Sequence, residues 1–116
     1  MTEKELAEFA ANRLDEHKAE NIITIDVSRI TPFASYYVIA TLQNERALGA
    51  IADVVAEEIE KAGGSIRAIE GKPETAWVLV DAGGVIIHLF LDWARKEIKL
   101  DDLVGERINK LVSKEA

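Results

Sequence analysis

Apolar residues recur at helical spacing in two long stretches of the chain. Leu6, Phe9, Ala10 and Leu14 fall on one side of a helix, which predicts an amphipathic helix over roughly residues 3–19. Thr2 followed by Glu5 resembles a capping box at its start. The second stretch begins after Asn44, a good cap residue, and Gly63-Gly64 ends it. Its apolar stripe comprises Leu48, Ile51, Ala52, Val55, Ile59 and Ala62.

Five shorter segments are rich in β-branched and apolar residues, which is typical of strands. They are residues 22–27, 36–41, 65–69, 76–81 and 85–91. The second is apolar at successive positions and favours a central strand that is covered on both faces. The third is expected at an edge of the sheet. Gly83-Gly84 separates the last two segments and predicts a hairpin turn.

The C-terminal part predicts two further helices. A short one is expected over residues 92–98. Asp101 or Asp102 is expected to cap a last one, a helical extension over residues 101–115. Its apolar side would carry Val104, Ile108, Leu111 and Val112.

The predicted order is α-β-β-α-β-β-β-α-α. Two helix-sized crossovers and two hairpin-like joins predict a mixed β-sheet with helices on both faces, rather than a doubly wound parallel sheet. We expect one α/β domain over residues 1–116, since the chain contains no linker, repeat or low-complexity segment.

Composition narrows the class of protein. The 116 residues are 48% hydrophobic, enough for a core without metals or disulfides. There is no cysteine, so disulfides, thiolate nucleophiles and cysteine metal sites are excluded. The charged start, Thr2-Glu3-Lys4-Glu5, does not resemble a signal peptide, and the longest apolar run, Val85–Leu91, is strand-sized. We expect a cytoplasmic protein that does not enter a membrane.

The balance of charge is acidic. Fourteen Lys and Arg stand against 21 Asp and Glu, a formal net charge of −7. Without a basic cluster, this charge disfavours direct, sequence-specific binding of nucleic acid. It favours a basic protein partner, or it serves only to keep the protein soluble.

Candidate catalytic chemistry is sparse. His17 lies on a predicted helix between charged residues and is expected to be solvated. His88 lies in an apolar strand, which indicates a structural or interfacial histidine rather than a base. Asp101 and Asp102 are adjacent and point in different directions, so they make a poor metal pair. No metal-binding spacing, phosphate loop or nucleophile elbow occurs, and we expect no catalytic residue, metal or cofactor.

Two tryptophans remain. Trp77 begins a strand and alternates with Leu79, and Trp93 follows Asp92 on the short helix. Each either packs in the core or anchors a partner, because tryptophan is enriched at binding hot spots. Arg95 and Lys96 follow closely and could complete an aromatic and cationic patch.

The segment that contains both tryptophans, EGKPETAWVLVDAGGVIIHLFLDWARKEIKLDDLVG, resembles the signature of the Iojap family, the ribosomal silencing factors. Upstream, SYYVIATLQNERALGAIADVVAEEIEKAG is similar to a second family segment and the helix that follows it. The resemblance covers about residues 3–105. The residues that carry it in the first segment are Glu70, Gly71, Trp77, Val78, Leu79, Asp81, Gly83, His88, Arg95, Leu100 and Leu103. The chain departs from the family pattern at Ser35, Leu42, Asn44, Ala47, Gly84, Ile98, Asp101 and Val104.

The resemblance implies a nucleotidyltransferase-like fold without nucleotidyltransferase activity. It also implies binding to the ribosomal protein numbered fourteen on the large subunit, which sterically blocks joining of the small subunit and represses translation. We expect a homodimer when no ribosome is present, because a free apolar patch tends to self-associate. The partner-binding residues that we expect are Tyr37, Trp77, His88, Arg95, Leu100, Asp101, Leu103 and Val104.

Two alternatives remain open. A true nucleotidyltransferase would need an Asp-x-Asp metal pair and a glycine-based phosphate grip. The chain has no such pair, and the glycines before Ser65 close a helix rather than open one. A divergent family member could instead serve as a dimeric interaction or ribosome-assembly module. The loss of two family aromatics, at Ile98 and Val104, favours that alternative.

Overall fold

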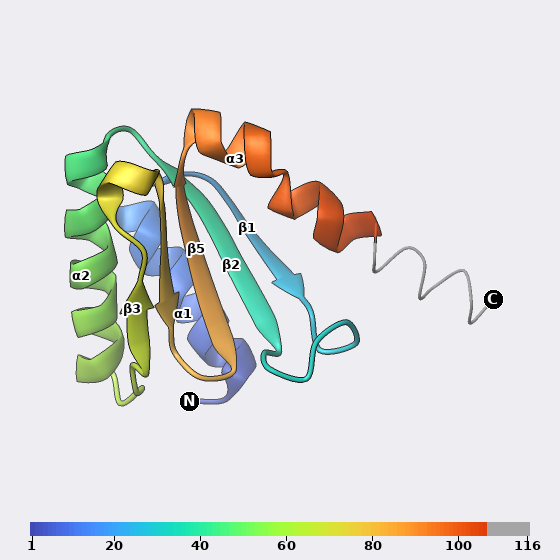
Figure 1. Cartoon of the computed structure of the whole chain (residues 1–116). Coiled ribbons are helices and arrows are strands. Elements are labelled where there is room, and N and C mark those ends of the chain that lie inside the picture. The colour runs from blue at the N-terminus through green and yellow to red at the C-terminus, as the bar shows by residue number, and fades with distance from the viewer. Residues whose placement is uncertain (107–116) are drawn as a thin grey trace.

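The structure, a computed structural model, describes residues 1–106. Its elements follow the predicted order (Figure 1). They are α1 (Glu3–Glu16), β1 (Glu20–Asp26), β2 (Tyr36–Leu42), α2 (Glu45–Lys61), β3 (Ala68–Glu70), a 3-10 turn (Pro73–Thr75), β4 (Trp77–Asp81), β5 (Val85–Leu91) and α3 (Asp92–Ile98). Residues 100–106 are also helical. The expected apolar positions Ile108, Leu111 and Val112 lie outside the described residues.

One five-stranded sheet forms the centre of the fold, in the order β1-β2-β5-β4-β3. β2 and β5 run parallel, and every other neighbouring pair is antiparallel. The predicted mixed sheet is therefore confirmed. β2 lies inside the sheet and its last five residues are buried, as its apolar run predicts, and β3 lies at an edge.

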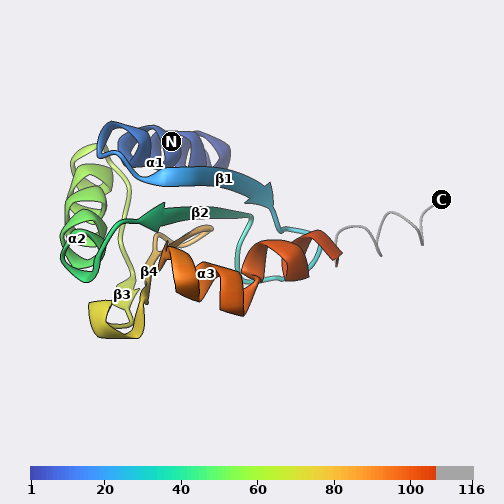
Figure 2. The same cartoon turned by 90° about the horizontal axis from the view of Figure 1, so that it is seen from above.

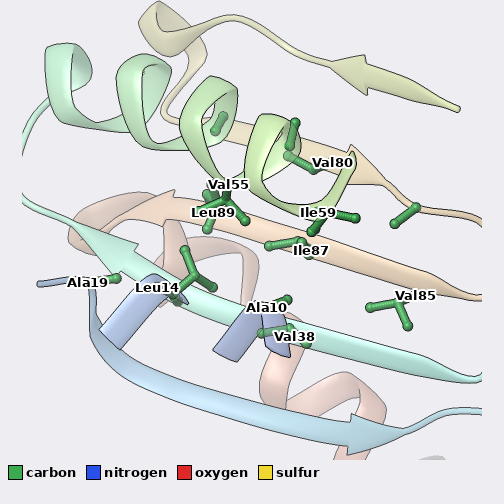
Figure 3. Packing of buried hydrophobic residues seen from close by; sticks show 14 of the residues in the cluster. Ala10, Leu14, Ala19, Val38, Val55, Ile59, Val80, Val85, Ile87 and Leu89 are labelled. Atoms are coloured by element: carbon green, nitrogen blue, oxygen red, sulfur yellow. The ribbon is translucent and has the colours of Figure 1, made fainter. Parts of the chain in front are cut away.

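Helices lie on both faces of the sheet, also as predicted. α1 and α2 cover one face, and α3 with residues 100–106 lies on the other (Figure 2). Between the sheet and α1 and α2 lies the main core, where Leu14, Val55, Ile59, Ile87 and Leu89 are fully buried (Figure 3). Burial of one such side chain contributes about 1.5–3 kcal/mol, so this face carries most of the stability.

Local signals fix both long helices. Thr2 and Glu5 form the predicted capping box, and the Asn44 side chain accepts a hydrogen bond from the Ala47 amide at 2.8 Å. α1 ends at Glu16, earlier than predicted, because Lys18 takes a left-handed conformation with φ 65°. Ala62 was expected in the buried stripe of α2, but it is the exposed C-cap residue.

Two further predicted details are wrong. The third strand was predicted over residues 65–69, but it pairs with β4 only over Ala68–Glu70, so it is shorter and begins later in the chain. Neither Asp101 nor Asp102 caps the last helix. Lys99, in a left-handed conformation, separates α3 from residues 100–106, and its carbonyl oxygen accepts from the Leu103 amide at 3.0 Å. No helix within residues 1–106 has both the length and the apolar character needed to cross a membrane.

Candidate partner-binding surface

The face of the sheet opposite α1 and α2 carries a row of rings. Side chains alternate along each strand, so Tyr37 on β2, His88 and Phe90 on β5, and Trp77 on β4 share this face. The Tyr37 ring meets the His88 ring edge-on at 4.6 Å between centroids. Trp77 stacks on Phe90 at 5.1 Å and lies 5.8 Å from His88. We call Tyr37, His88, Trp77 and Phe90 the aromatic row.

Two open grooves flank the aromatic row. The first has a volume of about 330 Å³ and is lined by Glu70, Gly71, Thr75, Trp77 and Leu79. The second has a volume of about 220 Å³ and is lined by Ile30, Thr31, Tyr37, Leu100, Leu103 and Val104. Both are mainly apolar, and Trp77, Leu79 and Tyr37 are only half-buried. Apolar side chains at the surface, next to concave features, are what a macromolecular partner can cover.

His88 lies beneath this surface. It is only 5% exposed, and its Nδ1 accepts a hydrogen bond from Trp77 Nε1 at 3.2 Å. Burial lowers the pKa of His88 to about 4, so the ring is neutral near pH 7. Its Nε2 has no hydrogen-bond partner within the described residues. Both ring contacts lie within the protein, and among residues 1–106 no carboxylate is hydrogen-bonded to the ring, as a catalytic base would require.

Arg95 has a side chain that is mostly buried and is paired within the protein. Its side chain is 12% exposed, and its Nε and one terminal nitrogen donate to both carboxylate oxygens of Asp101 at 3.2 and 2.7 Å. The other terminal nitrogen donates to the Asn21 carbonyl oxygen at 2.7 Å and to the Thr41 hydroxyl at 2.9 Å. Arg95 and Asp101 therefore connect α3 and residues 100–106 to β1 and β2.

The residues of the C-terminal segment differ in exposure. Leu103 is 54% exposed, Leu100 is half-buried, and Val104 is 4% exposed. Val104 packs with Val27 and Ala34 in a small core of its own. The expected site residues thus fall into two sets. Tyr37, Trp77, Leu100 and Leu103 form an accessible layer, and His88, Arg95 and Val104, which are mostly buried, form a supporting layer together with Asp101, which is half-buried and paired with Arg95.

Among the lining residues that sequence reasoning did not assign are two aliphatic ones, Leu79 and Ile30. Leu79 lines the first groove, and its alternation with Trp77 is the signal that could have placed it there. Ile30 lines the second groove from the irregular segment before β2, where no periodicity marks it. Trp93 is 57% exposed but lines neither groove.

The other histidine, His17, was expected to be solvated, but it is paired within the protein. His17 Nε2 lies 2.6 Å from a carboxylate oxygen of Glu58, whose other oxygen lies 2.6 Å from Arg13. The hydrogen bond to His17 and the charge of Arg13 lower the pKa of Glu58. This cluster joins α1 to α2, on the face away from the aromatic row. Over residues 1–106, no group of three or more His, Cys, Asp or Glu is placed to hold a metal ion.

The negative charge is concentrated on α1 and α2. Each of these helices carries five acidic and two basic residues, so the pair accounts for −6 of the net −7. On the other face, α3 carries two residues of each sign and is neutral, and residues 100–106 carry three acidic residues, Asp101, Asp102 and Glu106, and no basic one. Most of the negative charge therefore lies away from the aromatic row, and the two grooves beside the row are mainly apolar.

The sequence matches a known family over almost its whole length. The family model described as "Ribosomal silencing factor during starvation" matches residues 1–115. The ribosomal silencing factor of Bacillus subtilis is 31% identical over 106 residues, which cover 91% of this chain and 90% of that protein. That of Zymomonas mobilis is 37% identical over 100 residues, which cover 86% and 75%.

A plant protein and a crystal structure extend the comparison. The chloroplastic Iojap protein of Arabidopsis thaliana is 32% identical over 101 residues, which cover 87% of this chain and 40% of that protein. A crystal structure of a Chromobacterium violaceum protein superposes with a TM-score of 0.86 at 32% identity, over 90% of this chain and 88% of that one.

Proposed function

The chain belongs to the ribosomal silencing factor family, and from that premise we propose that it binds the large ribosomal subunit and represses translation. The contact would be made with the ribosomal protein numbered fourteen. Bound there, the protein would block the small subunit from joining. This role places the protein in the cytoplasm, where ribosomes work.

The observation that carries the proposal is the apolar surface over the aromatic row. Trp77 and Leu79 border one groove, and Tyr37, Leu100 and Leu103 border the other. A half-buried tryptophan beside a groove has the form of a binding anchor, and truncation of such an anchor typically costs ~2–4 kcal/mol of binding. In this proposal His88, Arg95, Asp101 and Val104 support the surface from beneath.

The proposal predicts a binding protein without turnover. The grooves beside the aromatic row are mainly apolar, and the side chains of His88 and Arg95 are buried or already paired within the protein. Incubation of the pure protein with magnesium and each nucleoside triphosphate should therefore leave the nucleotide intact. Protein-dependent turnover would reopen the nucleotidyltransferase alternative.

The direct test compares two tryptophans. Wild type, Trp77→Ala and Trp93→Ala would each be sedimented with purified large subunits, and circular dichroism would confirm the fold of each. Trp77→Ala should lose co-sedimentation, and Trp93→Ala should keep it, because Trp93 lines neither groove. In a subunit-joining assay, wild type should lower the yield of joined ribosomes and Trp77→Ala should not. A folded Trp77→Ala protein that still blocks joining would refute the site.

The second candidate, a dimeric interaction module, is favoured by the two lost aromatics. The aliphatic residues at these positions, Ile98 and Val104, have no ring to offer a partner. Ile98 is half-buried beside Phe90 and Ala94, and Val104 is buried. Under this alternative, wild type would fail to sediment with large subunits and would still form a homodimer. Sedimentation equilibrium at micromolar concentration would detect the dimer, which we also expect of the free silencing factor. Restoring Ile98→Tyr should strengthen ribosome binding if the first candidate is correct.

A further inference from the structure

The contact between Trp77 and His88 joins the accessible layer of the surface to the layer beneath it. In the antiparallel pair of β4 and β5, His88 is directly opposite Leu79, and Trp77 is directly opposite Phe90. Trp77 and His88 are therefore diagonal neighbours on one face, within reach of each other. The hydrogen bond from Trp77 Nε1 to His88 Nδ1 spans 3.2 Å.

The chemistry of the two rings makes this contact directional. An indole has one N–H hydrogen and no acceptor, so it can only donate. His88 Nδ1 can accept only when it carries no proton, which places the hydrogen of the neutral ring on Nε2. The side chains that face His88 from β2 and β4 are Tyr37, Ile39, Trp77 and Leu79, and of these only Tyr37 is titratable. Within the part of the chain that the structure describes, the Trp77 indole is the hydrogen-bond partner of Nδ1.

Packing fixes the same two rings from other sides. Phe90 stacks on the indole at an interplanar angle of 26°, and Tyr37 meets the imidazole edge-on at 68°. His88 is 5% exposed, so a partner that covers Trp77 does not reach the imidazole directly. Any effect of His88 on binding must then pass through its neighbours.

We propose that His88 is a positioning residue for the partner-binding surface: by accepting the indole hydrogen at Nδ1, it fixes the Trp77 ring and leaves only apolar ring surface for the partner. This inference rests on the proposed function. The ring is held before the partner arrives, so less side-chain entropy is lost on binding. The partner must meet Trp77 with apolar groups, or with a cation over the ring face, instead of a hydrogen-bond acceptor.

Arg95 supports the same conclusion about partner chemistry. Its guanidinium donates to Asp101, Asn21 and Thr41, so it offers the partner little hydrogen bonding. The Trp77 indole N–H and the Arg95 guanidinium, which could otherwise donate hydrogen bonds to a polar partner, thus both donate within the protein. Recognition at this surface then depends on shape and apolar contact.

A double-mutant cycle separates positioning from direct contact. His88→Leu removes the acceptor, and Trp77→Phe removes the donor while keeping an aromatic ring. In the wild-type background, His88→Leu should weaken binding to large subunits about tenfold, as expected for loss of one buried hydrogen bond. In the Trp77→Phe background, the same change should alter binding less than about twofold. His88→Gln, whose amide oxygen can accept, should restore part of the lost affinity.

Nuclear magnetic resonance on the wild-type protein tests the contact without any substitution. His88 should show an unprotonated Nδ1 and a protonated Nε2, and the Trp77 indole hydrogen should exchange with solvent more slowly than that of Trp93. The opposite tautomer, or equally fast exchange of both indoles, would overturn the proposal even if His88→Leu failed to fold. Equal losses from His88→Leu in both backgrounds would overturn it as well. If wild type does not bind large subunits, the proposed function fails, and the resonance data alone decide whether His88 holds Trp77.

Discussion

The two faces of the sheet use the same strands for different purposes. On one face, α1 and α2, with 14 and 17 residues, bury most of the apolar side chains. On the other, α3 has 7 residues and, with residues 100–106, leaves Trp77, Leu79 and Ile86 half-buried. On the outside of the first face, α1 and α2 together carry a net charge of −6, whereas on the second face α3 is neutral and residues 100–106 carry −3.

This difference shows that helix cover, more than strand composition, separates core from surface in this fold. Alternation supplies apolar residues to both faces of β4 and β5 alike. Where α1 and α2 cover the strands, these residues stabilise the fold. Where the cover is incomplete, they remain available to a partner, and the following experiments are designed to break or sharpen that division.

The largest expected effect is on stability, and it compares two neighbouring isoleucines on β5. Ile87 is fully buried under α1 and α2, and Ile86 is half-buried on the opposite face. Ile87→Ala should lower the free energy of unfolding by about 2–5 kcal/mol, because it leaves a cavity in the core. Ile86→Ala should lower it by about 1 kcal/mol, because less apolar area is lost. Urea unfolding measures both, and equal effects would show that the faces do not differ in this way.

The next effect is a dependence of stability on pH. The pKa of His88 is lowered from 6.5 to about 4 by burial. Below pH 6.5 the unfolded chain takes up a proton that folded His88 does not accept, so its contribution is full above pH 6.5 and is lost as pH falls towards 4. Between pH 6.5 and 4.5 the free energy of unfolding should fall by roughly 2 kcal/mol from this residue.

His88→Gln is the control for that measurement. It removes the titrating group, so the free energy of unfolding should change much less between pH 6.5 and 4.5. The pKa of Glu58 is lowered below its usual 4.5, so the loss of its contribution belongs mainly to more acidic solution. If the variant and wild type lost stability in parallel above pH 4.5, another group would be responsible.

Local signals were sufficient for much of the fold. α3 and the last strand have the predicted bounds, and Gly83, with φ 82°, makes the predicted turn between β4 and β5. The capping box and the Asn44 cap were also correct, because each joins residues three positions apart. Such contacts are visible in sequence spacing alone.

The contacts that organise the candidate site are not visible in this way. Arg95 reaches the carbonyl oxygen of Asn21, 74 positions away, at a point where Asn21 has a left-handed φ of 50° in a bulge of β1. His17 meets Glu58 across 41 positions. Asp101 was predicted as a helix cap because that is its common local role, but a long-range arrangement brings Arg95 to it. Periodicity contains no information on such pairs.

The third expected effect is the loss of stability when the Arg95–Asp101 pair, which attaches residues 100–106 to the rest of the protein, is weakened. Arg95→Lys keeps the charge but loses the paired hydrogen bonds to Asp101, so the free energy of unfolding should fall by about 1–2 kcal/mol. Ribosome binding should also weaken, because Leu100 and Leu103 lose their support. Lys96→Ala is the matched control on the same helix: its side chain is 77% exposed and pairs only with Asp92 among the described contacts. Lys96→Ala should lower the free energy of unfolding by less than about 0.5 kcal/mol. A larger loss of stability from Lys96→Ala than from Arg95→Lys would contradict this account.

The smallest effect should come from the acidic face, and it decides whether charge or apolar area directs binding. Glu57 and Glu60 lie exposed on α2, on the opposite side of the sheet from Trp77. If the apolar surface makes the contact, the double change Glu57→Gln and Glu60→Gln should alter affinity for large subunits less than about twofold at 0.15 M salt, where charges beyond about 8 Å are screened. Leu103→Ser, a single change on the other face, should weaken binding several-fold. If the acidic helices were instead the docking surface for a basic ribosomal protein, the double glutamine variant should lose more affinity than Leu103→Ser. Added salt should then weaken wild-type binding steeply and leave binding of the glutamine variant almost unchanged.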